Sequence, residues 1–89
     1  MEAPRPRDTT LRLLAFAAVR DLVGGSEVAL DLPFDTTVDG LWPLLLDRWP
    51  ALTPHRRSVR IAVNGAYASS EDAVRAGDEV ALIPPVAGG

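Results

Sequence analysis

Apolar and polar residues alternate along four stretches of the chain, and this alternation predicts four strands with one face toward a core. Successive side chains of a strand point to opposite faces, so every second residue marks the buried face. The four stretches are residues 10–16, 26–32, 58–63 and 79–83. Their inward positions are Leu11, Leu13 and Ala15, then Val28, Leu30 and Leu32, then Val59, Ile61 and Val63, and finally Val80 and Leu82.

Short signals between these strands predict how the chain turns. Residues 17–23 are predicted to be a short helical segment that Gly24-Gly25 ends, so the first two strands make a wide hairpin. Asn64-Gly65 predicts a tight hairpin turn, because both residues tolerate positive φ. Residues 66–68 then return as a fifth, short strand.

One stretch has the period of an amphipathic helix. Its apolar positions, which share one helical face, are Val38, Leu41, Trp42, Leu45 and Trp49. Thr36 or Thr37 is expected to cap its start, and Pro50 to end it. Pro43 conflicts with this helix, because an interior proline removes a backbone hydrogen bond and costs about 3 kcal/mol. We therefore expect a kink at Pro43, or a helix that effectively begins later.

The remaining segments complete a single α+β domain. Residues 51–57 are predicted to be a loop and residues 69–75 a helical turn. The order of elements is typical of the β-grasp (ubiquitin-like) fold, a mixed sheet of about five strands with one main crossing helix and short helical turns. By analogy with that fold, the first and last strands lie side by side at the centre. We expect a flexible leader at residues 1–8, the domain at 9–83 and an extended tail at 84–89.

Composition excludes several classes of function. Hydrophobic residues make up 47% and charged residues 24%, as in an ordinary globular domain. The net charge of −3 has the wrong sign for a nucleic-acid-binding domain, and Arg56, Arg57 and Arg60 are expected to be a solvated edge. Cysteine is absent, which excludes disulfides, thiolate metal sites and iron–sulfur clusters, and the single His55 has no metal-ligating partner.

Neither targeting nor catalytic signals stand out in the sequence. The first residues lack the apolar region of a secretory signal, and no run of about 18 apolar residues predicts a membrane span, so we expect a cytoplasmic protein. The sequence shows neither a catalytic-triad order nor a phosphate-binding glycine loop. Chemistry in a pocket built from the chain's own side chains is therefore not expected.

The C-terminal segment, residues 83–89, is the strongest candidate for chemistry. Six residues after a strand reach at most about 20 Å, and Pro84 and Pro85 keep the base of this tail extended. Gly88 and Gly89 have no Cβ, so a narrow tunnel could close around their backbone. The Gly89 carboxylate could then be adenylated, and a sulfur nucleophile could displace AMP to leave a thiocarboxylate. The plain alternative is a Gly-Gly ending that arose by chance.

A second candidate is the outward face of the two presumed central strands. A sheet face that met only water would be polar, whereas this face is apolar beside the tail, which predicts a docking surface. The expected partner contacts are Leu14, Phe16, Ala62, Ala81, Ile83, Pro84, Pro85 and Val86. Phe16 and Ile83 are the expected anchors. The alternative is that a loop covers the patch.

Several segments resemble the MoaD/ThiS-like sulfur carrier family, and most of all its MoaD branch, the small subunits of molybdopterin synthase. They are residues 14–24 (Leu-Ala-Phe-Ala-Ala-Val-Arg-Asp-Leu-Val-Gly), Thr37-Val38, Trp49-Pro50, Val63-Asn64 and residues 77–89 (Gly-Asp-Glu-Val-Ala-Leu-Ile-Pro-Pro-Val-Ala-Gly-Gly). The resemblance spans about residues 10–89, and the final segment is its most specific part. Pro43 departs from the pattern.

The resemblance implies a reaction and a set of partners. An E1-like enzyme of the MoeB type uses ATP to adenylate the terminal glycine, and a sulfur donor system supplies the sulfur of the thiocarboxylate. A large catalytic subunit of the MoaE type then receives the tail, and the sulfur passes to cyclic pyranopterin monophosphate to build the molybdopterin dithiolene. By this resemblance Gly89 carries the sulfur and Gly88 threads the channel. The chain is then no enzyme on its own, binds no cofactor and joins a heterotetramer.

Three other functions remain open from the sequence. The chain could be a thiocarboxylate carrier of another pathway, such as a ThiS-like carrier for thiamin thiazole or a carrier for cysteine synthesis. It could be a ubiquitin-like protein modifier that is joined through Gly89 to a lysine of a target. It could also be a binding-only β-grasp module whose tail is inert.

Overall fold

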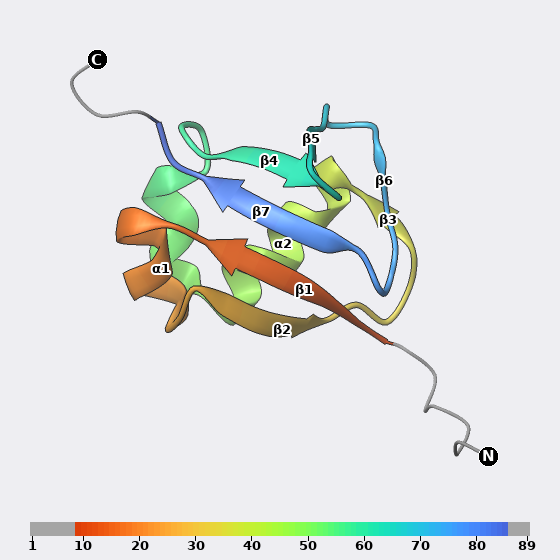
Figure 1. Ribbon diagram of the computed structural model, residues 1–89, viewed down its shortest axis with the longest axis horizontal. Coiled ribbons are helices and arrows are strands. Elements are labelled where there is room, and N and C mark those ends of the chain that lie inside the picture. The colour runs from red at the N-terminus through yellow and green to blue at the C-terminus, as the bar shows by residue number, and fades with distance from the viewer. Residues whose placement is uncertain (1–8, 86–89) are drawn as a thin grey trace.

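The computed structural model describes residues 9–85, which form a mixed sheet with helices on one of its faces (Figure 1). The elements are β1 (Thr10–Ala15), α1 (Ala17–Val23), β2 (Glu27–Asp31), β3 (Thr36–Thr37), α2 (Val38–Arg48), the 3₁₀-helix η1 (Pro50–His55), β4 (Arg60–Val63), β5 (Ala66–Tyr67), β6 (Ala73–Val74) and β7 (Glu79–Ile83). Their order along the chain agrees with an α+β domain.

Five of the strands form one sheet in the order β2-β1-β7-β4-β5. The first and last strands, β1 and β7, are parallel neighbours at its centre, and the other pairs are antiparallel. This topology confirms the β-grasp prediction, including the central pairing that periodicity alone does not reveal. Its consequence for function is that the last strand ends in the middle of the sheet rather than at an edge.

The core lies between the sheet and the helices behind it. The predicted inward positions of β1, β4 and β7 and the apolar face of α2 are its main components, as the alternation and the helical spacing indicated. The side chains that are fully buried are Leu11, Leu13, Val19, Leu41, Leu45, Leu52, Val74, Val80 and Leu82. The opposite face of the sheet is not covered by a helix (Figure 1).

Replacing Leu82 by alanine is expected to lower the free energy of unfolding by about 2–5 kcal/mol, because it leaves a cavity at the centre of the core. Leu82 is fully buried on β7, the central strand. Urea unfolding followed by circular dichroism measures the loss. Its neighbour Ile83 faces the other way and is only half-buried, so Ile83→Ala should cost clearly less. Equal losses would contradict the assignment of the two faces.

Two turns form as their residues predict. Asn64 and Gly65 have φ values of 51° and 88°, the positive φ values that a two-residue hairpin between β4 and β5 requires. Gly24 ends α1 with φ of 91°, and its N–H donates to the carbonyl of Arg20. A residue with a Cβ is disfavoured in this left-handed conformation, which explains why glycine stops the helix here.

Pro43 lies within α2, which runs unbroken from Val38 to Arg48. The expectation that the helix begins later is therefore wrong, and a kink at Pro43 stays a prediction. Pro43 is exposed, and the carbonyl that loses its helical donor belongs to Asp39 in the exposed first turn, where water can bind it. Thr37 caps that turn, since its Oγ1 accepts a hydrogen bond from the Gly40 N–H at 3.1 Å.

Two short segments also differ from the sequence-based expectation. Residues 50–55 are a 3₁₀-helix rather than a loop, and Leu52 anchors it in the core. The helical turn expected at residues 69–75 is wrong, because Ala73–Val74 forms β6 and pairs with β3. Val74 is fully buried, so long-range pairing and burial outweigh the local helical signal of the preceding polar residues.

Candidate functional site

The uncovered face of the sheet carries a row of small and apolar residues across four strands. In the register of the sheet Leu14 lies opposite Ala81, Ala81 opposite Ala62, and Ala62 opposite Tyr67. Directly opposed side chains on one face are in contact range. The register therefore joins β1, β7, β4 and β5 into one surface, which we call the outer face.

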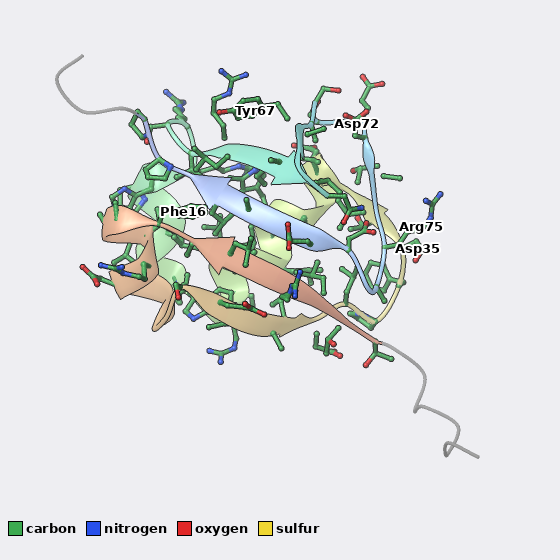
Figure 2. The ribbon with its side chains drawn as sticks, viewed as in Figure 1. Phe16, Asp35, Tyr67, Asp72 and Arg75 are labelled. Carbon is green, nitrogen blue, oxygen red and sulfur yellow. The ribbon has the colours of Figure 1, made fainter. Side chains whose placement is uncertain are left out.

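The second row of the outer face lies where β7 ends. Ile83 is opposite Arg60 of β4. The last pair of the parallel β1–β7 register is Ala15 with Leu82, so Phe16 and Ile83 are the residues that directly follow it on the two chains. Phe16 is the residue before α1, and its carbonyl accepts from the N–H groups of Val19 at 3.1 Å and Arg20 at 3.3 Å. Figure 2 shows Phe16 in front of the sheet, near the ends of β1 and β7.

The backbone is strained at the corner that presents Phe16. Ala17 has φ of 51°, a conformation that costs a residue with a Cβ about 1–2 kcal/mol. The turn ends β1 and starts α1 within one residue, which leaves the Phe16 ring 48% exposed instead of folded into the core. A strained residue next to an exposed aromatic side chain favours a functional role for this corner.

The structure brings together the described residues that the sequence predicted as contacts. Leu14, Ala81, Ile83 and Pro84 are half-buried, Phe16 and Pro85 are exposed, and no segment of residues 9–85 covers the Phe16 ring. The remaining predicted site residues, Val86, Gly88 and Gly89, lie outside the described residues.

Ala62 is the exception among the predicted contacts. It lies on the outer face, but only 6% of its surface is exposed. A methyl side chain between Ala81 on one strand and Tyr67 on the next is covered by its neighbours. Ala62 is thus a spacer on the predicted outward face that offers little surface of its own, and its contact with a partner stays a prediction.

Tyr67 and Arg60 belong to the same face, and the sequence reasoning missed them. Tyr67 is 63% exposed, and the Arg60 guanidinium carbon lies 4.7 Å from the centroid of its ring. The sequence did contain a signal that Tyr67 lies on this face. A two-residue turn at Asn64-Gly65 pairs Ala62 with Tyr67 and so places both on one face. Aromatic residues and arginine are the side chains most enriched at the centres of protein interfaces.

The opposite end of the outer face is charged. The Arg12 guanidinium donates a hydrogen bond to the Glu79 carboxylate, and its Nε lies 3.6 Å from Glu27 Oε2. These side chains are half exposed or nearly so, where an ion pair contributes little to stability. The outer face is therefore apolar and aromatic where β7 ends and charge-paired where β7 begins.

The described residues offer little for chemistry of their own. No group of three or more His, Cys, Asp or Glu side chains within residues 9–85 could hold a metal ion. Between Thr9 and Pro85, no helix has the length and apolar character needed to cross a membrane. What the arrangement can do is present the end of β7, and the segment that follows it, in the middle of an apolar surface.

Comparison with known proteins identifies the family of the chain. The sequence model of the ThiS family matches residues 13–89, most of the chain. The chain belongs to the ThiS family. The match includes the strand and corner that carry Phe16 and extends to Gly89.

Several curated relatives of this ThiS-family chain are described as the sulfur carrier subunit of molybdopterin synthase. The molybdopterin synthase sulfur carrier subunit of Escherichia coli (strain K12) is 42% identical over 84 residues, which cover 89% of this chain and 99% of the relative. The protein of the same description from Arabidopsis thaliana is 30% identical over 89 residues, covering 100% of this chain and 93% of the relative. The similarity thus runs over nearly whole proteins.

Solved structures of similar proteins agree with the β-grasp fold of this ThiS-family chain. The crystal structure of SAMP1, a small archaeal modifier protein, from Haloferax volcanii has a TM-score of 0.74 and 31% identity, over 90% of this chain and 99% of that one. The solution structure of Urm1 from Trypanosoma brucei has a TM-score of 0.68 over 96% of this chain and 100% of its own. At 20% identity, the latter supports the fold alone.

Proposed function

We propose that this ThiS-family chain is the sulfur carrier subunit of molybdopterin synthase. The observation that carries the proposal is the match over nearly the whole length of the Escherichia coli protein of that description. The family match to residue 89 supports extending the comparison to the C-terminal glycines. The chain is then a substrate-like subunit, and the groups that catalyse sulfur transfer belong to the large subunit.

The proposed chemistry takes place at the Gly89 carboxylate. An oxygen of this carboxylate attacks the α-phosphate of ATP, pyrophosphate leaves, and an acyl adenylate remains. Hydrosulfide (HS⁻) supplied by the donor system then adds to the carbonyl carbon, AMP and a proton leave, and a thiocarboxylate results. That sulfur is delivered to cyclic pyranopterin monophosphate. ATP belongs to the activating enzyme in this scheme, the chain itself holds no cofactor, and the reaction is cytoplasmic.

The outer face supplies the docking surface for this chemistry. The tail begins where β7 ends, next to Arg60 of β4 and one residue beyond the last pair of β1 and β7, so a partner seated on the outer face lies directly at the root of the tail. Phe16 and Ile83 contribute apolar contacts, and Pro84 and Pro85 lead toward the partner. We propose a MoaE-like large subunit as the partner in sulfur transfer and a MoeB-like enzyme as the partner in activation.

The proposed thiocarboxylate can be tested by intact-mass measurement. The chain is incubated with its activating enzyme, ATP and a sulfur donor, and the expected product has one oxygen replaced by sulfur. Omitting ATP should prevent this change, because a carboxylate is a poor acyl donor until it is adenylated. Failure to form either an adenylate or a thiocarboxylate with the cognate activating enzyme would contradict the proposal.

A protein modifier is the second candidate, and the likeness to SAMP1 at 31% identity favours it. Its chemistry shares the acyl adenylate but ends with an isopeptide bond between Gly89 and an amino group of another protein. Intact mass distinguishes the two functions in protein isolated from the host. A modifier gives conjugates of higher mass, whereas a carrier gives the sulfur-substituted chain.

A further inference from the structure

A surface hollow of about 560 Å³ lies beside the outer face, between the start of α2 and the segment that leads into β4. Three arginines line it, Arg56, Arg57 and Arg60, together with one carboxylate, Asp39. We call it the arginine hollow. The chain has a net charge of −3, so this concentration of positive charge runs against the charge of the molecule.

Arg56 is already neutralised within the hollow. Its guanidinium donates to Asp39 Oδ1 at 3.4 Å, and its Cζ lies 5.6 Å from the centroid of the buried Trp42 ring. This arginine therefore lines the α2 side of the hollow, beside Asp39 and Trp42.

Arg57 and Arg60 combine two properties: they line the hollow, as Arg20 and Arg48 do not, and they lack an ion pair within the described residues, unlike Arg56. Neither forms an ion pair with a carboxylate of residues 9–85, whereas Arg12 pairs with Glu27 and Glu79, and Arg75 pairs with Asp35 (Figure 2). Both are exposed. Their positive charge is available to a group from another molecule.

Arg60 connects the hollow to the outer face. It lines the hollow, lies opposite Ile83 at the root of the tail and stacks on the Tyr67 ring. A stacked guanidinium loses less conformational freedom on binding than a free one, and the N–H groups at its edge can still bind a carboxylate in a bidentate way. A partner on the outer face thus meets a preorganised cation at the border of the hollow.

We propose that the arginine hollow receives an acidic segment of the large subunit, whose carboxylates pair with Arg57 and Arg60. This inference rests on the proposed function and adds the chemistry of the partner surface to it. The support is the positive charge of Arg57 and Arg60, which no carboxylate of residues 9–85 pairs with, together with the continuity of the hollow with the outer face at Arg60. Because the chain is acidic overall, such a local cationic site sets the orientation of approach and raises the rate of association.

The test measures association with the cognate large subunit by surface plasmon resonance at low and at high salt. The double variant Arg57→Glu, Arg60→Glu is expected to lower the association rate constant about tenfold or more at low salt, with most of the native salt dependence lost. The matched control is Arg48→Glu, Arg75→Glu, which changes the net charge equally. Arg48 also stacks on an aromatic ring, Trp49 at 4.8 Å, but it does not line the hollow, and the control should keep the native rate within about twofold.

Each outcome decides the proposal. A native rate and salt dependence in the hollow variant, or an equal loss in the control, overturns it. So does a change confined to self-association in sedimentation, which would make a second copy of this chain the occupant. If charge reversal impairs folding, the double variant Arg57→Gln, Arg60→Gln replaces it in the test. Its association rate constant is expected to fall by less than that of the charge-reversed variant. An affinity unchanged by Phe16→Asp would instead refute the docking face, and with it the proposed function's geometry.

Discussion

Removing Gly89 is expected to lower sulfur transfer to the pterin precursor by more than about 10²-fold, while the fold remains intact. The truncated chain still ends in a carboxylate, but that group lies one residue, about 3.3–3.6 Å, short of the position that the native chain reaches. A misplacement of about 1 Å at a reacting group already costs about 10²-fold in rate. Dithiolene formation by the assembled complex measures the loss.

Two additional variants make this test specific. A chain extended by one alanine after Gly89 should be equally inactive, because the reactive carboxylate is displaced and carries a Cβ. Phe34→Asp leaves the tail intact and should retain most of the activity, because Phe34 lies between β2 and β3, away from the end of β7. Circular dichroism of each variant should match the native spectrum, since the core lies within residues 11–82. Full product formation by the truncated chain would contradict the role of Gly89.

Replacing Phe16 by aspartate is expected to weaken the complex with the large subunit by about 2 kcal/mol or more, which is about 30-fold in Kd. The ring is 48% exposed beside the root of the tail, so the change removes an apolar contact and places an unpaired carboxylate in the interface. The stability of the isolated chain should change little, because half of the ring already meets solvent. Isothermal titration calorimetry with the cognate large subunit measures the affinity.

Phe34 provides the control for this substitution. It is 61% exposed and lies between β2 and β3. The strand before it, β2, ends at Asp31, which pairs with Thr10 at the start of β1, whereas Phe16 follows the other end of β1. Phe34→Asp removes the same side chain and adds the same charge, yet it should leave the affinity within about twofold of native, as for most surface positions outside a hot spot. Equal weakening by both substitutions would show a general effect of charge and would contradict the docking face.

Local patterns predicted most of the elements because their signals are strong and mutually consistent. The alternation in β1 and β7, the apolar face of α2 and the Asn64-Gly65 turn each depend on residues close in sequence, and the structure confirms all of them. The failures occurred where a distant contact decided the conformation. Residues 73–74 are extended because β3 pairs with them, and α2 tolerates Pro43 because the residue is exposed and the opposite face is buried.

For the candidate site, too, the sequence predicted what depends on local spacing and missed what depends on contacts between distant residues. The sequence placed Leu14, Phe16 and Ile83 on one face, since strand period alone assigns their sides. It did not show that Tyr67 covers Ala62, or that Arg60 stacks on Tyr67, because burial and ring geometry depend on which strands become neighbours. The arginine hollow was equally hidden, since α2 and β4 meet there only after folding.

The sequence by itself determined the elements, the two faces of each strand and the candidate role of the C-terminal glycines, because these depend on residue type and spacing along the chain. The tertiary structure decided which outward residues are open and which are covered, and that Arg57 and Arg60 line a hollow beside the outer face. Those properties arise from pairings between β1, β7, β4 and β5, and such pairings bring together residues that are far apart in sequence. Their energetics come from contacts that exist only in the folded chain.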